Sequence, residues 1–152
     1  MRPDDLRHLR AAIEISRAAR AHGNEPYGAL LVAAGGAVLL SAENTQVTER
    51  DCTGHAELNL MREASRRFDA ATLVGCTLYA TGEPCPMCAG AIYWGGIRRV
   101  VYALSVESMI ALAGPNADEI RLSCREVLGR GGREVEVLGP ALEDEARRAF
   151  GA

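Results

Sequence analysis

The sequence predicts an α/β protein in which helices cover both faces of a five-stranded mixed sheet, a three-layer α/β/α arrangement. Short apolar runs of strand length alternate along the chain with segments whose apolar residues repeat at helical spacing. About thirty residues separate the last two expected strands, which is too long for a hairpin and suits a helical crossover between parallel strands. With 152 residues, 48% of them hydrophobic, the chain is expected to form a single domain over 1–152.

The first two thirds of the chain supply most of the expected elements. An aspartate at residue 4 or 5 is suited to cap a first helix, and Gly23 is suited to end it. Gly35 and Gly36 lie between two apolar runs, as in a β-hairpin. The expected elements are a helix over 4–22, strands over 28–33 and 37–40, a helix opening at Thr53 or Gly54, a third strand over 72–74 and 76–79, and a short helix over 86–94 with Pro86 in its first turn.

The last third has weaker signals. Glycine and proline break the chain at 114–115 and glycine again at 131–132, so elements are expected between these breaks. They are a fourth strand over 99–104, helices over 105–112 and 117–128, a fifth strand over 134–138, and a closing helix over 140–150.

Composition excludes several classes of function. The chain carries 17 basic and 20 acidic residues, a net charge of −3, and every basic residue is arginine. Without lysine, neither a Schiff-base mechanism nor a Walker phosphate loop is possible. The acidic balance also makes nucleic acid an unlikely partner. No apolar run approaches the roughly 20 residues that cross a bilayer, and the N-terminus turns acidic at once, so we expect a cytoplasmic protein without a membrane partner.

Two short motifs carry the chemistry. His55-Ala56-Glu57 and Pro84-Cys85-Pro86-Met87-Cys88 each lie at the expected start of a helix. Two cysteines three residues apart in a first turn can direct both sulfurs at one ion, and a helix N-terminus favours the thiolate. With His55 they form a Cys₂His set with an open fourth position, the pattern of catalytic zinc. Glu57 can then reach a zinc-bound water without binding the metal.

A structural zinc site is the main alternative. Cys52 stands three residues before His55, so Cys52, His55, Cys85 and Cys88 offer four ligands with finger-like spacing. Two points argue against it: an α/β domain of this hydrophobic richness needs no metal to fold, and Glu57 would have no task. Cys52 is therefore expected to be a loop thiol, and Cys76 and Cys124 are expected in the core.

At these residues the sequence resembles the cytidine deaminase-like superfamily, whose signature is His-x-Glu followed by Pro-Cys-x-x-Cys. Residues 82–94 look most like the branch of bacterial guanine deaminases and tRNA adenosine deaminases, and the resemblance extends from about Glu25 to Leu104. It implies a zinc-dependent hydrolytic deaminase, usually dimeric, with His55, Cys85 and Cys88 as zinc ligands and Glu57 as proton shuttle. The chain has Thr81-Gly82 where the family commonly has Ser-Cys.

The resemblance also implies four substrate contacts. Asn44 corresponds to an asparagine that hydrogen-bonds the base, and Trp94 to a bulky position near the pocket. Tyr27 corresponds to a residue lining the base site, and the backbone of Ala56 can meet a base edge. Three of them have a plainer structural interpretation as well. Asn44 can be a turn residue, Trp94 a cap on the core, and Tyr27 part of the wall of the site without a specific contact.

The favoured function is removal of the exocyclic amine from a small aminated base or related N-heterocycle, with a guanine-like free base preferred, by a homodimeric enzyme. The segments 116–126 and 140–148 carry more acids than arginines, which disfavours docking of an anionic polymer. Deamination of cytosine or a nucleoside, editing of adenosine in tRNA, and a non-catalytic zinc module remain the alternatives.

Overall fold

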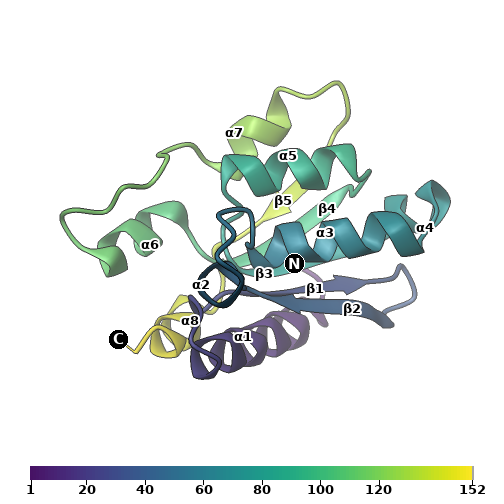
Figure 1. Cartoon of the computed structure of the whole chain (residues 1–152). Helices are drawn as coiled ribbons and strands as arrows, with labels where there is room; N and C mark the ends of the chain where they lie inside the picture. The colour runs from purple at the N-terminus through teal and green to yellow at the C-terminus, as the bar shows by residue number, and fades with distance from the viewer. Residues whose placement is uncertain (152) are drawn as a thin grey trace.

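The structure, a computed structural model, describes residues 1–151 and confirms the predicted fold: helices lie on both faces of a five-stranded sheet (Figure 1). The strands are β1 (Gly28–Val32), β2 (Val38–Glu43), β3 (Thr77–Gly82), β4 (Arg99–Leu104) and β5 (Glu136–Leu138). The helices are α1 (Asp5–Ala21), α2 (Gln46–Glu49), α3 (Ala56–Arg67), α4 (Ala70–Val74), α5 (Pro86–Trp94), α6 (Val106–Ala113), α7 (Cys124–Gly129) and α8 (Glu143–Ala149).

The sheet is mixed, with the order β2-β1-β3-β4-β5. Strand β1 pairs antiparallel with both β2 and β3, while β3, β4 and β5 run parallel. The tight turn between β1 and β2 requires a left-handed backbone at Gly36, with a φ of 90°. Because β3 and β4 are parallel and joined through α5, the segments that follow both strands emerge at the same edge of the sheet.

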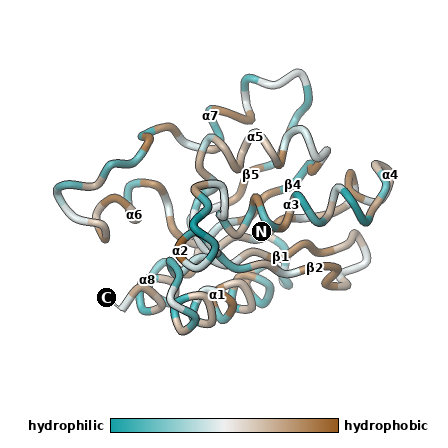
Figure 2. Tube along the Cα trace, viewed as in Figure 1, coloured by the Kyte–Doolittle hydropathy of each residue, from teal (hydrophilic) through white to brown (hydrophobic). Residues whose placement is uncertain are grey.

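Two apolar layers hold the helices to the sheet, and neighbouring residues of one strand supply both. Leu31 packs with Leu60 and Ile92 on the side of α3 and α5. Leu30 packs with Leu9 and Ile13 of α1 on the opposite side. Apolar colours accordingly run along the central strands, whereas the segment around α2 is hydrophilic (Figure 2). Burial on both faces explains why these strands read as continuous apolar runs.

A buried ion pair fixes the start of α1 to the sheet. Asp5 is fully buried and accepts hydrogen bonds from both terminal nitrogens of Arg99, each at 2.8 Å, and from the Tyr79 hydroxyl at 2.7 Å. Burial alone raises the pKa of a carboxyl, but the bonds from Arg99 and Tyr79 outweigh it and hold the pKa of Asp5 below its usual range. The pair thereby ties α1 to β3 and β4.

One predicted strand segment is wrong. Residues 72–74 belong to helix α4, and β3 begins only at Thr77. Thr72 and Val74 have β-branched side chains, which favour strands, but the Asp69 side chain caps the helix by accepting a hydrogen bond from Thr72 N at 2.8 Å. The cap, together with burial of Leu73, outweighs the strand propensity.

Several boundaries also differ. Helix α3 starts at Ala56, with His55 as its N-cap, and α2 was not predicted. Of the helix expected over 117–128, only the last part is helical: α7 begins at Cys124 and ends at Gly129. It begins there because Ser123 and Glu126 form a capping box. The closing helix and the fifth strand are shorter than predicted, at Glu143–Ala149 and Glu136–Leu138. Within residues 1–151, no helix has both the length and the apolarity that crossing a membrane requires.

Candidate active site

The two motifs meet where the N-termini of α3 and α5 face each other. His55 is the N-cap of α3 and Cys85 the N-cap of α5, and both have extended backbone. Pro86 occupies the first helical position, where its missing N–H costs nothing, and it also favours extended backbone at Cys85. Cys88 lies one turn along and is buried. The extended backbone at the two helix starts thus directs all three side chains to one point.

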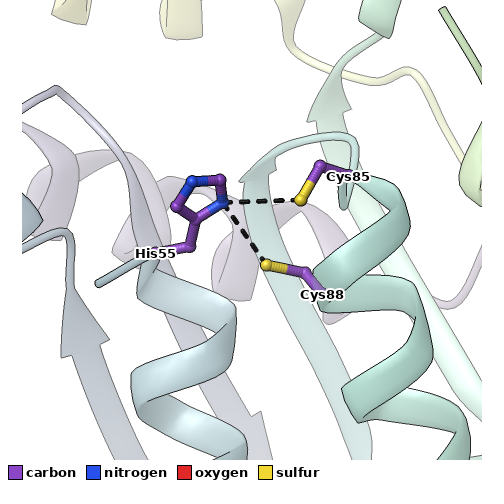
Figure 3. Close-up of side chains that lie close together, drawn as sticks. All are labelled: His55, Cys85 and Cys88. Atoms are coloured by element: carbon purple, nitrogen blue, oxygen red, sulfur yellow. Dashed lines mark hydrogen bonds between the residues drawn. The ribbon is translucent and has the colours of Figure 1, made fainter. Parts of the chain in front are cut away.

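The geometry of these side chains fits a tetrahedral metal ion. His55 Nδ1 lies 3.5 Å from Cys85 Sγ and 3.5 Å from Cys88 Sγ (Figure 3). All three donor atoms lie within 4.8 Å of one another. Ligands of a tetrahedral zinc at ~2.0–2.3 Å are roughly 3.5 Å apart, so the three atoms already stand near the corners of such a site. Imidazole nitrogen with two sulfurs is also a donor set that zinc prefers.

The alternative of a four-ligand structural site, with Cys52 as the fourth ligand, is not supported by the structure. In the described part of the chain the cluster of potential ligands contains His55, Cys85 and Cys88, without Cys52. Cys52 is exposed in the loop before α3, as expected for a loop thiol. Cys76 and Cys124 are buried, which confirms their predicted place in the core. A three-residue donor set leaves room for a further ligand, as a catalytic site requires.

The pKa values of the two thiols are shifted in opposite directions. Hydrogen bonds from Cys88 and His55 lower the pKa of Cys85 to about 4, so its sulfur is a thiolate at neutral pH. The same contact with Cys85, together with burial, raises the pKa of Cys88. In turn, the hydrogen bond to Cys85 raises the pKa of His55. To bind a metal ion, these groups would need both sulfurs as thiolates and the imidazole neutral, so metal binding would release protons.

Glu57 lies beside this cluster in the first turn of α3. Its side chain is buried, and its carboxylate Oε2 is 3.9 Å from Cys88 Sγ. Burial raises the pKa of Glu57 to about 7. Both forms of the carboxyl are therefore populated near neutral pH, which is the condition under which a carboxyl accepts and returns protons most effectively.

This site has counterparts in known proteins. The model of the cytidine and deoxycytidylate deaminase zinc-binding region matches residues 2–104. The chain belongs to this family. Its zinc-binding region contains the His55, Cys85 and Cys88 cluster, so the family and the geometry agree on zinc as the cofactor. The resemblance in the motifs is thereby confirmed, and the fold is that of cytidine deaminase-like proteins.

Relatives in the family act on different substrates. The chain is 40% identical over 147 residues to the "Probable cytosine deaminase" of Schizosaccharomyces pombe, covering 93% of this chain and 87% of that protein. It is 44% identical over 78 residues to the guanine deaminase of Bacillus subtilis, covering 51% of this chain and 49% of that protein. A solved tRNA:A34 deaminase superposes with a TM-score of 0.71 at 27% identity, covering 95% of this chain and 99% of the other. Membership of the family makes the chain a deaminase that hydrolyses C–N bonds, but these relatives do not identify its substrate.

Tyr27 and Ala56 are two of the predicted substrate contacts. Ala56 is buried and stands between His55 and Glu57 in the sequence, at the start of α3. Burial raises the pKa of Tyr27, and the charges of Glu119, Glu57 and Cys85 raise it further. The half-buried Tyr27 ring packs edge-on against Phe150, with ring centroids 5.2 Å apart. The contacts of both residues with a base stay predictions.

Asn44 is buried where β2 ends. Its Oδ1 accepts a hydrogen bond from Gln46 N at 3.0 Å, and its Nδ2 donates to Gln46 Oε1 at 2.8 Å. These are the bonds of a turn residue, and they lead the chain into α2. The turn role is therefore present in the structure, and the contact with a base stays a prediction.

Trp94 lies at the far end of α5 from Cys85 and Cys88. It is 81% exposed and packs edge-on against Tyr93, so it does not cap the core. It borders an open groove of about 360 Å³ between α3 and α5, whose wall also includes Met61, Arg62 and Ala91. Within one protomer, Trp94 faces solvent rather than the zinc ligands.

Two residues near the site were not predicted from the sequence. Glu119, in the chain between α6 and α7, lies near enough for its charge to contribute to the raised pKa of both Tyr27 and His55. Glu83, inside the zinc motif itself, is 5% exposed and bonds to two helices. In the sequence, the motif marks Glu83 only as a neighbour of Cys85. An acidic residue two positions before a candidate metal ligand was the signal that could have pointed to it.

Proposed function

We propose that this chain removes the exocyclic amine of a small aminated nucleobase or related N-heterocycle by hydrolysis and releases ammonia. The observation that carries the proposal is Glu57, a buried carboxyl with a pKa raised to about 7, next to a Cys₂His donor set. A structural zinc site has no use for such a group. A hydrolytic deaminase needs one, because protons must pass from water to the ring and to the departing amine.

His55, Cys85 and Cys88 would hold the zinc ion, which supplies a hydroxide at neutral pH by lowering the pKa of a bound water. Glu57 would accept one proton from that water and pass it to a ring nitrogen. It would then move the proton of the added hydroxyl group to the amine, so that the C–N bond breaks and ammonia leaves. Burial suits Glu57 to both steps, because a carboxyl with a pKa near 7 gives up a proton as readily as it takes one. Tyr27 shields one side of the reacting centre from water.

Charge favours a small base over a polymer. The charge of Glu119 contributes to the raised pKa of both Tyr27 and His55, so we infer that an acidic group lies on the approach to the site. A carboxylate there accepts hydrogen bonds from the amino and ring N–H groups of a base, and it repels a phosphate backbone. The chain also offers no lysine to offset that repulsion. We therefore propose a free base as substrate and no turnover of a tRNA anticodon stem-loop.

Among free bases, a guanine-like ring is our first candidate, because residues 82–94 resemble the branch that includes the bacterial guanine deaminases. Cytosine is a second candidate because of one observation. The similarity to the S. pombe protein runs over 147 residues and so includes the C-terminal third, whereas the similarity to the B. subtilis guanine deaminase spans 78 residues. Glu119 and α6 lie in that C-terminal third.

We further propose that two copies assemble through the groove between α3 and α5. Trp94 is the most exposed large apolar side chain on this face, and Met87 of the same helix is also exposed. A second copy would cover both side chains around a two-fold axis.

The experiment is ammonia release from guanine, cytosine, adenine, guanosine and cytidine, with zinc quantified on the same sample. Glu57→Gln is the matched control, because it keeps the shape of the side chain and removes its proton chemistry. We expect turnover of at least one free base by the native chain and none by Glu57→Gln, at about one zinc per chain in both. Inosine formed in a tRNA stem-loop, with no ammonia from any free base, would contradict the proposal.

A further inference from the structure

Glu83 joins the N-termini of two helices. Its Oε2 accepts a hydrogen bond from Val106 N at 3.0 Å, and its Oε1 accepts one from Cys124 N at 2.9 Å. Val106 is the first residue of α6 and Cys124 the first residue of α7. Such N–H groups have no partner within their own helix, so a carboxylate satisfies both at once, at the positive end of each helix dipole.

The two bonded residues mark the ends of one long connection. Residues 106–123 comprise α6 and the extended chain after it, and this part projects from one side of the molecule (Figure 1). The α6 end has a second attachment, because Glu143 of α8 accepts a hydrogen bond from the Ser108 hydroxyl at 2.6 Å. For the α7 end, Glu83 is the link to the zinc motif. Both ends of the connection thus depend on one carboxylate.

The connection in turn packs against the wall of the site. A methyl group added at Gly82 would lie 2.6 Å from Met109 Sδ and 3.1 Å from the Tyr27 ring. Met109 of α6 and the Tyr27 ring therefore both approach Gly82 at the end of β3, three residues before Cys85. A displacement of α6 would alter the packing around this residue.

We propose that Glu83 is a positioning residue for substrate selection: by holding the N-termini of α6 and α7, it sets where Met109 and the Tyr27 ring stand and hence which ring fits between them and the zinc ligands. The inference rests on the proposed deamination of a small base. It assigns Glu83 no contact with substrate or metal. Its effect passes through the 106–123 connection, so it should appear in the choice and affinity of the base rather than in the proton transfer at Glu57.

The side-chain chemistry explains why a carboxylate is needed. Both partners of Glu83 are N–H donors, so both of its oxygens must accept. Glutamine has the same shape but places an NH₂ group against one donor and leaves that buried N–H without an acceptor. Glu83→Gln therefore releases one end of the connection with little change in volume.

The test compares Glu83→Gln with Tyr79→Phe, a control variant that removes a different buried hydrogen bond to a carboxylate, the 2.7 Å contact with Asp5. We expect Glu83→Gln to raise KM for the preferred base, or to shift the kcat/KM ratio between two bases, by about tenfold, since small displacements at a binding wall have effects of that size. We expect kcat within about threefold of the native value and zinc near one per chain. Amide hydrogen exchange should speed up within 106–124 in Glu83→Gln, but not in Tyr79→Phe.

A purely structural role would give another pattern. If Glu83→Gln only lowers the unfolding temperature, with base selection, KM and exchange in 106–124 matching the Tyr79→Phe control, the proposal is overturned. Loss of zinc from Glu83→Gln would also overturn it. If the native chain deaminates no free base, the proposed function fails, and the exchange measurement still decides whether Glu83 holds the connection.

Discussion

The zinc-ligand loops and the 106–123 connection lie at the same edge of the sheet but are held in place differently. His55 and Cys85 are helix N-caps, so the residues next to them in the sequence determine where they point. The connection is positioned by Glu83 and Glu143, which are 23 and 35 residues from their partners Val106 and Ser108. The candidate zinc ligands are thus positioned by local sequence, whereas the 106–123 connection, which we propose to influence substrate selection, is positioned by distant pairs. Substitutions in the two regions should therefore fail in different ways.

The largest effect is expected at the locally encoded ligands. Cys85→Ser or Cys88→Ser removes one of three donors, so zinc and activity should disappear together. Cys52→Ser is the matched control, since Cys52 is exposed and outside the cluster. Metal content per chain and ammonia release on the same samples check this. A Cys52→Ser chain without zinc would mean that the loop thiol is a ligand after all.

The next effect concerns Glu57, which belongs to the same local motif but binds no metal in our proposal. Glu57→Ala should lower kcat by roughly 10² to 10⁴ with zinc retained, because only proton transfer is lost. In the native chain, with the pKa of Glu57 at about 7, activity should change across neutral pH. Loss of zinc in the variant would instead make Glu57 a ligand.

A long-range pair away from the site should affect stability alone. Asp5→Asn breaks the ion pair with Arg99 and should cost about 3 kcal/mol of unfolding free energy, with base selection unchanged. The pKa of Asp5 is depressed in the folded state, so its contribution is present above the unfolded pKa of ~4 and is lost as pH falls below it. Urea unfolding at pH 7 and pH 3 measures the cost of the substitution and its pH dependence. The native chain should lose more unfolding free energy on acidification than the Asp5→Asn variant does.

The smallest effect on a single chain is expected at Trp94. Because its side chain is 81% exposed, Trp94→Ala should change the stability of one protomer little. We predict that it weakens association of two copies, and light scattering across micromolar concentrations measures this. A native chain that scatters as a 16.2 kDa monomer would contradict the proposed dimer.

The same contrast explains what could be predicted from the sequence. The fold followed from apolar periodicity and zinc as the cofactor from motifs whose spacing is local, and both are confirmed. The structure brings His55, Cys85 and Cys88 together as a candidate site, and their roles as ligands stay predictions. The helix over Ala70–Val74 was missed because its β-branched residues suggest a strand, while its Asp69 cap is one hydrogen bond that periodicity does not reveal. The roles of Glu57, Asn44, Ala56, Trp94 and Tyr27 toward substrate stay predictions.

The 106–123 connection could not be predicted for a physical reason. Its course depends on which buried acceptor each helix N-terminus meets, and Glu83 meets Cys124 N across 41 residues of sequence. Nothing in the sequence near Cys124 specifies that partner; only Ser123 and Glu126, which form the capping box, indicate a helix start there. If Glu83 acts as we propose, selection of the base lies in the part of the chain with the weakest local signals.

The Asp5 contacts also have a consequence for the order of folding during synthesis. Asp5 bonds to Tyr79 and Arg99, which are 74 and 94 residues further along the chain. Helix α1 is made before β3 and β4, so its buried aspartate lacks its partners Tyr79 and Arg99 until these strands have been made. Leu9 and Ile13 of α1 also lack part of their final packing until then, because residues of β3 and β4 belong to the same core cluster. The start of α1 thus reaches its final place late, and a nascent chain halted before Arg99 should be a good substrate for proteases and chaperones.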